Sequence, residues 1–257
     1  MTQGPSIEPA TRPFVVPSAD LDAGAPWRWL RAGWRDVRRT PGLTLLFGAV
    51  IVLVSAGMCW LAYALGRFAL LATLLSGFVF VAPLLCVGLY CVSRALEQGR
   101  RPQLRESFVL ARRVLGQAGV YALGQGVIVL LWSRAGMMVS AFFPYDGSDP
   151  GAFREFLALG SAVGAVFASL TFAVTAFSLP MIADRDVDMV TAAVSSVHAV
   201  MRNKRVMVVW GVLLVALTAI GFATALIGLG LLMPWLAYAS WHAYRETLDA
   251  SSWPALA

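Results

Sequence analysis

The chain has 257 residues, of which 59% are hydrophobic and only 13% are charged, and its mean hydropathy is +0.73. These values exclude an ordinary soluble domain of this length and indicate a membrane protein. The net charge is +6. The three cysteines, Cys59, Cys86 and Cys91, all lie in apolar runs, so they are typical of buried hydrophobic residues and not of a disulfide framework.

Residues 1–25 are rich in Pro, Ser, Gly and Ala and lack the apolar core of a signal peptide. We therefore expect a disordered cytoplasmic tail, with the first membrane span acting as the insertion signal. Residues 26–248 form the predicted membrane domain, and residues 249–257 form a second cytoplasmic tail.

Four stretches without Asp, Glu, Lys or Arg are long enough to cross the hydrocarbon core, which takes about 20 residues of helix. They cover residues 43–65, 68–93, 114–133 and 156–183. A fifth stretch, residues 206–244, has 39 positions and would be roughly 58 Å long as one helix, about twice the thickness of that core. It is predicted to fold back as two spans with a turn near residues 225–228. The fold class is therefore an all-α polytopic bundle of six transmembrane helices.

The basic residues orient these spans, because cytoplasmic loops of membrane proteins keep an excess of Lys and Arg. All but three of the 20 Lys and Arg fall before span one, between spans two and three, between spans four and five, or after span six. The exceptions are Arg67, Arg134 and Arg154. Both termini are therefore predicted to be cytoplasmic.

Three charged segments before the odd-numbered spans have apolar residues at helical spacing and a polar or basic opposite face. The apolar positions are Trp27, Leu30, Trp34 and Val37, then Leu104, Phe108, Ala111 and Leu115, then Val187, Val190, Val194, Val197 and Met201. The pattern predicts three amphipathic helices in the cytoplasmic membrane interface, in contact with anionic lipid head groups. The alternative is ordinary amphipathic helices packed on the protein's own cytoplasmic face.

The two ends of the membrane domain resemble each other. Residues 34–48 align without gaps with residues 197–211, and residues 82–94 align with residues 233–245. The middle third fits the same plan more loosely. We interpret this as three copies of a unit made of one interfacial helix and two spans. The alternative is the general similarity of hydrophobic helices to one another.

The alignment places Pro83 on Pro234 and Arg94 on Arg245, and Pro180 takes the same place in the middle third. Each proline removes a backbone donor, so each predicts a helix kink near the cytoplasmic interface. A cavity or gate built at the three kinks is the alternative function of these positions.

Several longer motifs resemble one known family. They are "GFVFVAPLLCVGLY" at residues 77–90, "LWSRAGMMVSAFF" at 131–143, "SLPMIADRDVDMVTAAVSSVHAVMRNKRVMVVWG" at 178–211 and "WHAYRETL" at 241–248. With them, residues 34–248 resemble DUF2189, a bacterial family of integral membrane proteins of unknown function. The resemblance implies a multi-pass protein of the bacterial inner membrane and implies no activity.

Only two histidines are present, His198 and His242, and neither has Cys or carboxylate neighbours at metal-ligand spacing. Zinc and haem sites gather more ligands than this, so we expect no metal site and no cofactor. Hydrogen bonding to interfacial groups is the expected role of both imidazoles.

Four charged residues follow the fourth predicted span, namely Asp184, Arg185, Asp186 and Asp188. Asp186 is expected to cap a helix that begins near Val187. The other carboxylates, together with Arg94 and Arg245, are expected to form a cytoplasmic ion-pair network that ties the repeat units together. A proton or cation site is the alternative for this cluster.

Arg134 is the one charge placed to lie at membrane depth, because residues 135–143 continue apolar after it. An arginine in a membrane span is a candidate functional residue. Trp132 beside it favours an interfacial position instead, with the following segment lying along the outer surface.

The sequence contains no nucleophile motif, phosphate-binding glycine loop or nucleic-acid module. The expected function is therefore that of a non-enzymatic scaffold, assembly or regulatory protein in contact with lipids and other membrane proteins. The alternative is a transporter or channel for a lipid-like or small apolar solute.

The six-span topology is testable with reporter fusions after Ala25, Ser148 and Ala257. We expect cytoplasmic reporter activity at both ends and periplasmic activity at Ser148. A periplasmic signal from the C-terminal fusion would contradict the fold-back of residues 206–244.

Overall fold

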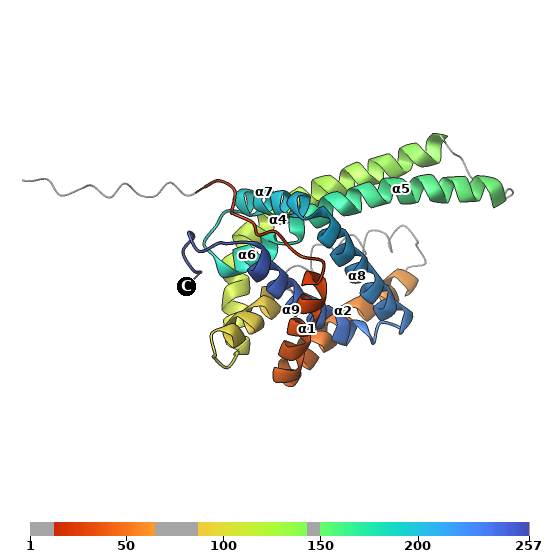
Figure 1. Cartoon of the computed structure of the whole chain (residues 1–257). Helices are drawn as coiled ribbons and strands as arrows, with labels where there is room; N and C mark the ends of the chain where they lie inside the picture. Colours follow the sequence, from red (N-terminus) through yellow and green to blue (C-terminus); the bar gives the residue numbers. More distant parts are fainter. Residues whose placement is uncertain (1–12, 65–86, 143–149, 257) are drawn as a thin grey trace, which may run out of the picture.

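The structure is a computed structural model that describes residues 13–64, 87–142 and 150–256 (Figure 1). These residues form helices and two isolated β-bridges, so the predicted all-α class is confirmed. The labelled helices are α1 (Ala25–Arg39), α2 (Pro41–Ala64), α4 (Leu104–Phe142), α5 (Pro150–Thr175), α6 (Ser178–Asp184), α7 (Met189–Arg202), α8 (Lys204–Ala223) and α9 (Leu229–Thr247). Residues 87–97 form a further helical segment before α4.

Four helical stretches among the described residues are long and apolar enough to cross a membrane: Pro41–Leu61, Gly119–Val139, Gly151–Asp184 and Lys204–Ala223. They overlap the first, third, fourth and fifth predicted spans. The second predicted span, residues 68–93, lies largely outside the described residues, as does Pro83. The count of six spans and the internal repeat therefore stay predictions.

The long charge-free run divides into α8 and α9 at residues 224–228, where a turn was expected. Ala225 and Leu226 have φ angles of 53° and 71°, and these left-handed conformations help the chain to reverse within a few residues. α9 is not among the four apolar stretches because its last turns carry His242, Arg245 and Glu246. Many of its other residues are buried inside the protein.

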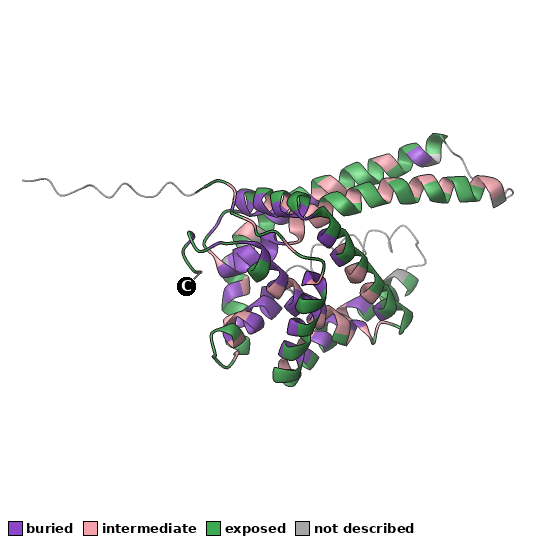
Figure 2. Ribbon diagram, in the orientation of Figure 1, coloured by how far each residue is buried: buried purple, intermediate pink, exposed green. Residues whose placement is uncertain are grey.

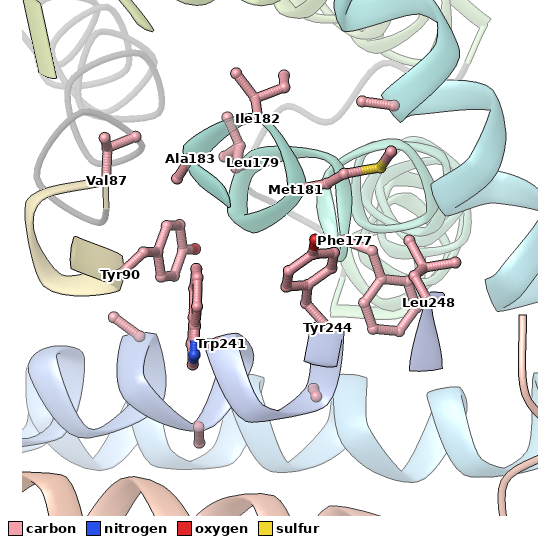
Figure 3. Close-up of a cluster of buried hydrophobic side chains, with 14 of the residues drawn as sticks. Val87, Tyr90, Phe177, Leu179, Met181, Ile182, Ala183, Trp241, Tyr244 and Leu248 are labelled. Atoms are coloured by element: carbon pink, nitrogen blue, oxygen red, sulfur yellow. The ribbon is translucent and has the colours of Figure 1, made fainter. Parts of the chain in front are cut away.

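α9 is the helix around which the others pack, and it contacts α1, α2, α6 and α8. Its aromatic residues Trp241 and Tyr244 face α6 and the helical segment 87–97 (Figure 3). There Trp241 stacks on Tyr90 with ring centroids 6.4 Å apart. Buried residues concentrate around α9, α1, α6 and α7, whereas α4 and α5 expose most of their length (Figure 2). The core therefore lies at one end of the helices and not along the whole bundle.

Glycines set the closest approaches to α9. A Cβ added at Gly33 of α1 would lie 2.7 Å from the backbone nitrogen of Ala239. A Cβ added at Gly48 of α2 would overlap the carbonyl oxygen of Gly230. That carbonyl loses its normal helical donor because Pro234, four residues later, has no N–H. Helices that meet through bare backbone in this way need glycine at the crossing point.

α4 is one continuous helix of 39 residues. The predicted third span and the amphipathic segment before it are therefore not separate elements. The first part of α4 contacts α6 and α7, and the second part pairs with α5 as a hairpin that extends away from the rest (Figure 1). Trp132 of α4 lies over Gly164 of α5, with its indole nitrogen 4.0 Å from the position of an added Cβ.

The other two predicted amphipathic helices form as α1 and α7. Of the predicted apolar positions of α1, Leu30 and Val37 are buried, whereas Trp27 and Trp34 are exposed. α7 turns its small residues inward, including Ala192 and Ser195, and exposes Val190 and Met201 to 57% and 53%. Small side chains allow α7 to lie close to its neighbours, which leaves the larger apolar residues outside.

Both terminal segments pack on the core end of α9. Ser18 forms an antiparallel bridge with Leu248, and Arg185 forms another with Ala255. Trp253 is only 5% exposed. The predicted tails are therefore ordered from residue 13 onward at the N-terminus and through residue 256 at the C-terminus, because buried side chains and backbone hydrogen bonds hold them.

The contact between Gly48 and Gly230 yields a stability prediction. Gly48→Ala is expected to lower the free energy of unfolding by about 1–3 kcal/mol, because the new methyl group overlaps backbone and not a flexible side chain. Gly57→Ala is the matched control on α2, where an added Cβ meets nothing within 4 Å. Equal thermal stability of the two variants in detergent would contradict this packing.

Candidate functional site: a polar cluster beside α9

The candidate site is a set of polar side chains on α1, the segment 87–97, α6, α9 and the residue after α6. We call it the α9 polar cluster, and it comprises Asp36, Ser93, Arg94, Glu97, Asp184, Arg185, His242, Tyr244 and Arg245. Two buried carboxylates form its centres.

Asp36 is the first centre and is 4% exposed. Its Oδ2 accepts a hydrogen bond from Ser93 Oγ at 2.8 Å and lies 2.8 Å from His242 Nε2. An ionised carboxylate only accepts hydrogen bonds, so Nε2 is the donor in this contact when Asp36 is ionised. These contacts compensate the cost of removing the charge from water and join α1 to α9 and to the segment 87–97.

Glu97 extends the cluster from His242 to Arg245. Its Oε1 lies 3.6 Å from His242 Nδ1, and its Oε2 lies 3.3 Å from Arg245 Nε. The imidazole therefore stands between two carboxylates, Asp36 on one side and Glu97 on the other. His242 is three residues before Arg245, so one face of α9 presents both groups to Glu97.

Asp184 is the second centre and is 6% exposed. Its Oδ2 accepts hydrogen bonds from Tyr244 Oη at 3.0 Å and from Arg185 Nε at 3.0 Å, and it lies 3.4 Å from Arg245 Nη1. Its Oδ1 lies 3.6 Å from Arg94 Nε. One buried carboxylate thus faces three guanidinium groups from three segments.

Arg94 also binds backbone carbonyls. It donates to the carbonyl oxygen of Leu256 from Nη2 at 2.6 Å and to that of Ala183 from Nη1 at 3.4 Å. The C-terminal segment is therefore fixed to the same cluster as the helices. A surface pocket of about 450 Å³ lies beside it, lined by the terminal segments together with Arg185 and Arg245.

The structure brings together five of the seven residues singled out from the sequence: Arg94, Asp184, Arg185, His242 and Arg245. His198 lies apart, exposed on α7. Asp186 is exposed as well, and only its backbone N–H is held, by the carbonyl oxygen of Pro254 at 2.9 Å.

The expected helix cap at Asp186 is wrong. α7 begins at Met189, and Asp188 Oδ1 accepts from the Thr191 backbone N–H at 2.9 Å. Only Val187 separates the two aspartates, and the backbone at Asp186 pairs with the C-terminal segment instead.

Sequence reasoning missed Asp36, Ser93, Glu97 and Tyr244. A signal for Asp36 exists, since it falls one turn after Ala32 and Gly33 and two turns after Trp29 and so shares the inner face of α1. Ser93 and Glu97 are four residues apart on one helical face. Their contact with α9 depends on tertiary packing, which no local pattern in the sequence specifies.

Two of the three predicted kinks lie within the described residues. Pro180 is the third residue of the short helix α6, just after the break that ends α5 at Thr175. Pro234 lies inside α9 and is buried. Pro180 is buried as well, and α9 continues as a helix through Pro234.

Arg134 lies in α4, exposed and within the candidate span Gly119–Val139. The helix continues past it to Phe142, so residues 135–142 do not form a separate segment along the surface. No carboxylate of the described residues forms an ion pair with Arg134. In the same part of the chain, His, Cys, Asp and Glu side chains do not gather in a group that fits a metal ion.

Comparison with known proteins gives one match. Residues 70–184 match the model of a family described as "Predicted integral membrane protein (DUF2189)". The resemblance to this family is confirmed over that segment, which includes Arg94, Arg134 and Asp184. The match is narrower than the expected range of residues 34–248. No curated protein and no solved structure matches the chain.

The cluster predicts a large stability difference between two neighbouring aspartates. Asp184→Asn leaves two partly buried guanidinium groups, Arg94 and Arg185, and the exposed Arg245 without their shared buried carboxylate. We therefore expect a loss of about 3 kcal/mol of unfolding free energy. Asp186→Asn removes an exposed charge of the same type and is expected to change stability by less than about 0.5 kcal/mol. Thermal unfolding in detergent measures both, and similar losses would show that Asp184 is not a centre of the cluster.

Proposed function

We propose that this chain is a non-enzymatic scaffold, that is, an assembly or regulatory protein of the bacterial inner membrane. Its match to a family of predicted integral membrane proteins over residues 70–184 supports the membrane location. It holds partner membrane proteins through the α4–α5 hairpin. Both termini lie in the cytoplasm in this proposal. The pairing of the two terminal segments with each other supports a location on one side of the membrane.

The observation that carries the proposal is one face of α4, which we call the outward stripe. It consists of Leu123, Val127, Leu130, Arg134 and Met137. Their spacing of three or four residues places them on one helical face. Leu123 and Leu130 are exposed to 74% and 71%, and Met137 to 59%. The stripe is therefore apolar and mostly exposed, and it contains one arginine.

An arginine on an apolar face within a candidate span requires an anionic partner, because a guanidinium group in hydrocarbon loses its hydration. The described residues supply Arg134 with no such partner. A second copy of the same stripe would bring two arginines together and so repel. The stripe instead fits a transmembrane helix of another protein that carries a carboxylate at the same depth.

The ionisable residues of the α9 polar cluster support a structural role. They neutralise one another in ion pairs at one end of the molecule. Pro234 is buried, one turn after Gly230, where α9 meets α2. These contacts favour a scaffold over a carrier whose proline kinks line a cavity.

Site-specific photo-crosslinking in native membranes tests this proposal. A photoreactive residue at Leu130, on the outward stripe, is expected to give one discrete adduct with one membrane protein. Leu53 of α2 is the matched control, because it is 70% exposed on another candidate span. Adding Arg134→Leu is expected to remove the adduct while leaving the amount of folded protein unchanged.

Three results would contradict the scaffold. One is a diffuse set of adducts equal at Leu130 and Leu53. Another is an adduct that survives Arg134→Leu, which would show that the arginine does not bind a carboxylate of the partner. The third is a purified protein without partners that retains a small apolar molecule, which would favour a transporter or channel.

A further inference from the structure

The outer face of α1 forms a second, independent surface. We define the α1 arginine–tryptophan face as Trp27, Arg31, Trp34, Arg35 and Arg38, all of which are exposed. At 100° per residue these five side chains fall within an arc of about 100°. Basic and indole side chains therefore share one narrow face of a 15-residue helix.

Packing against α9 fixes which way this face points. Gly33 sits against the backbone at Ala239, and Trp29 packs edge-on against Trp210 of α8 with ring centroids 5.3 Å apart. Trp235 Nε1 donates to the carbonyl oxygen of Leu30 at 2.8 Å. These contacts hold the opposite face of α1 in the core, so the arginine–tryptophan face cannot turn inward.

The arginines of this face differ from the neighbouring Arg28. Arg28 is bound by the carboxylates of Asp22 and Glu246, and its hydrogen bonds lower the pKa of Asp22 to about 2. Arg31, Arg35 and Arg38 form no ion pair with any carboxylate in residues 13–64, 87–142 or 150–256. Their guanidinium groups are therefore available to an anion from outside the chain.

The position of α1 in the chain identifies that anion. Only Thr40 separates α1 from the candidate span Pro41–Leu61, so Arg38 lies within about one helical turn of the hydrocarbon boundary. This is the level of lipid head groups, where tryptophan side chains also prefer to lie. Guanidinium groups bind phosphate oxygens in bidentate fashion, and Lys or Arg near the surface favours anionic lipid.

We propose that the α1 arginine–tryptophan face is a binding site for the head groups of anionic phospholipids in the leaflet that faces α1. Arg31, Arg35 and Arg38 bind the phosphates, and Trp27, 56% exposed, lies among the glycerol and upper acyl regions. Trp34, 37% exposed, borders the site while its ring packs edge-on against Trp235 of α9, with ring centroids 5.3 Å apart. The site does not involve the α4–α5 hairpin, so the lipid-binding proposal and the scaffold proposal are tested independently.

Native mass spectrometry of the full-length protein, released from neutral detergent, tests the site. The probes are phosphatidylglycerol and phosphatidylcholine at equal concentrations. The unmodified protein is expected to retain phosphatidylglycerol in preference. The triple variant Arg31→Gln, Arg35→Gln, Arg38→Gln is expected to lose at least about tenfold in that retention, since each arginine contributes several-fold.

The matched control removes the same charge from a second basic segment, which has no tryptophan beside its exposed arginines, as Arg101→Gln, Arg105→Gln, Arg112→Gln. It is expected to keep the preference within about twofold. Circular dichroism and thermal unfolding establish that the variants are folded. If the first triple variant does not fold, the single variant Arg35→Gln replaces it in the test. Its retention of phosphatidylglycerol is expected to fall roughly fivefold.

Three outcomes would overturn the proposal. Equal losses in the two triple variants would show a general effect of net charge and no site on α1. Equal retention of both lipids by the unmodified protein would remove the anionic preference. Displacement of phosphatidylglycerol by an equal concentration of inorganic phosphate would assign the surface to a soluble anion and not to a lipid.

Discussion

The structure depends on the burial of two carboxylates, Asp36 and Asp184, against α9. An ionised carboxylate removed from water is costly unless hydrogen bonds and opposite charges surround it. Ser93 and His242 do this for Asp36, and three arginines with Tyr244 do it for Asp184. Because the partners come from α1, α9, the segment 87–97 and the chain after α6, satisfying the two charges fixes how these pieces lie relative to one another.

Backbone contacts at glycines also position the helices around α9. α9 meets α1 at Gly33 and α2 at Gly48, and the carbonyl freed by Pro234 lies at the second crossing. In a membrane the apolar side chains gain little from leaving lipid, so close packing and polar contacts set the helix arrangement. Burial therefore differs along the molecule: the end around α9 is closely packed and contains the polar cluster, whereas the α4–α5 hairpin has few buried residues. The dense end supports the fold, and the exposed hairpin is the part that we propose binds partner proteins.

The sequence predicted what depends on local composition. It identified the all-α class, the turn at residues 224–228 and the charged residues Arg94, Asp184 and Arg245, because hydropathy and charge are read directly along the chain. It failed where distant segments decide the outcome. Asp188 caps α7 in place of Asp186 because the backbone of Asp186 pairs with Pro254, and Asp36 is buried only because α1 packs on α9. The predicted tails pack for the same reason, through contacts across almost the whole chain length.

A double-mutant cycle between Asp36 and His242 tests the central role of the buried carboxylates most directly. The free energy of unfolding in detergent would be measured for Asp36→Asn, His242→Gln and the double variant. The paired geometry, with Nε2 2.8 Å from Oδ2, predicts a coupling energy of at least about 1 kcal/mol, because each single change removes the same interaction. Additive effects of the two substitutions would contradict the account.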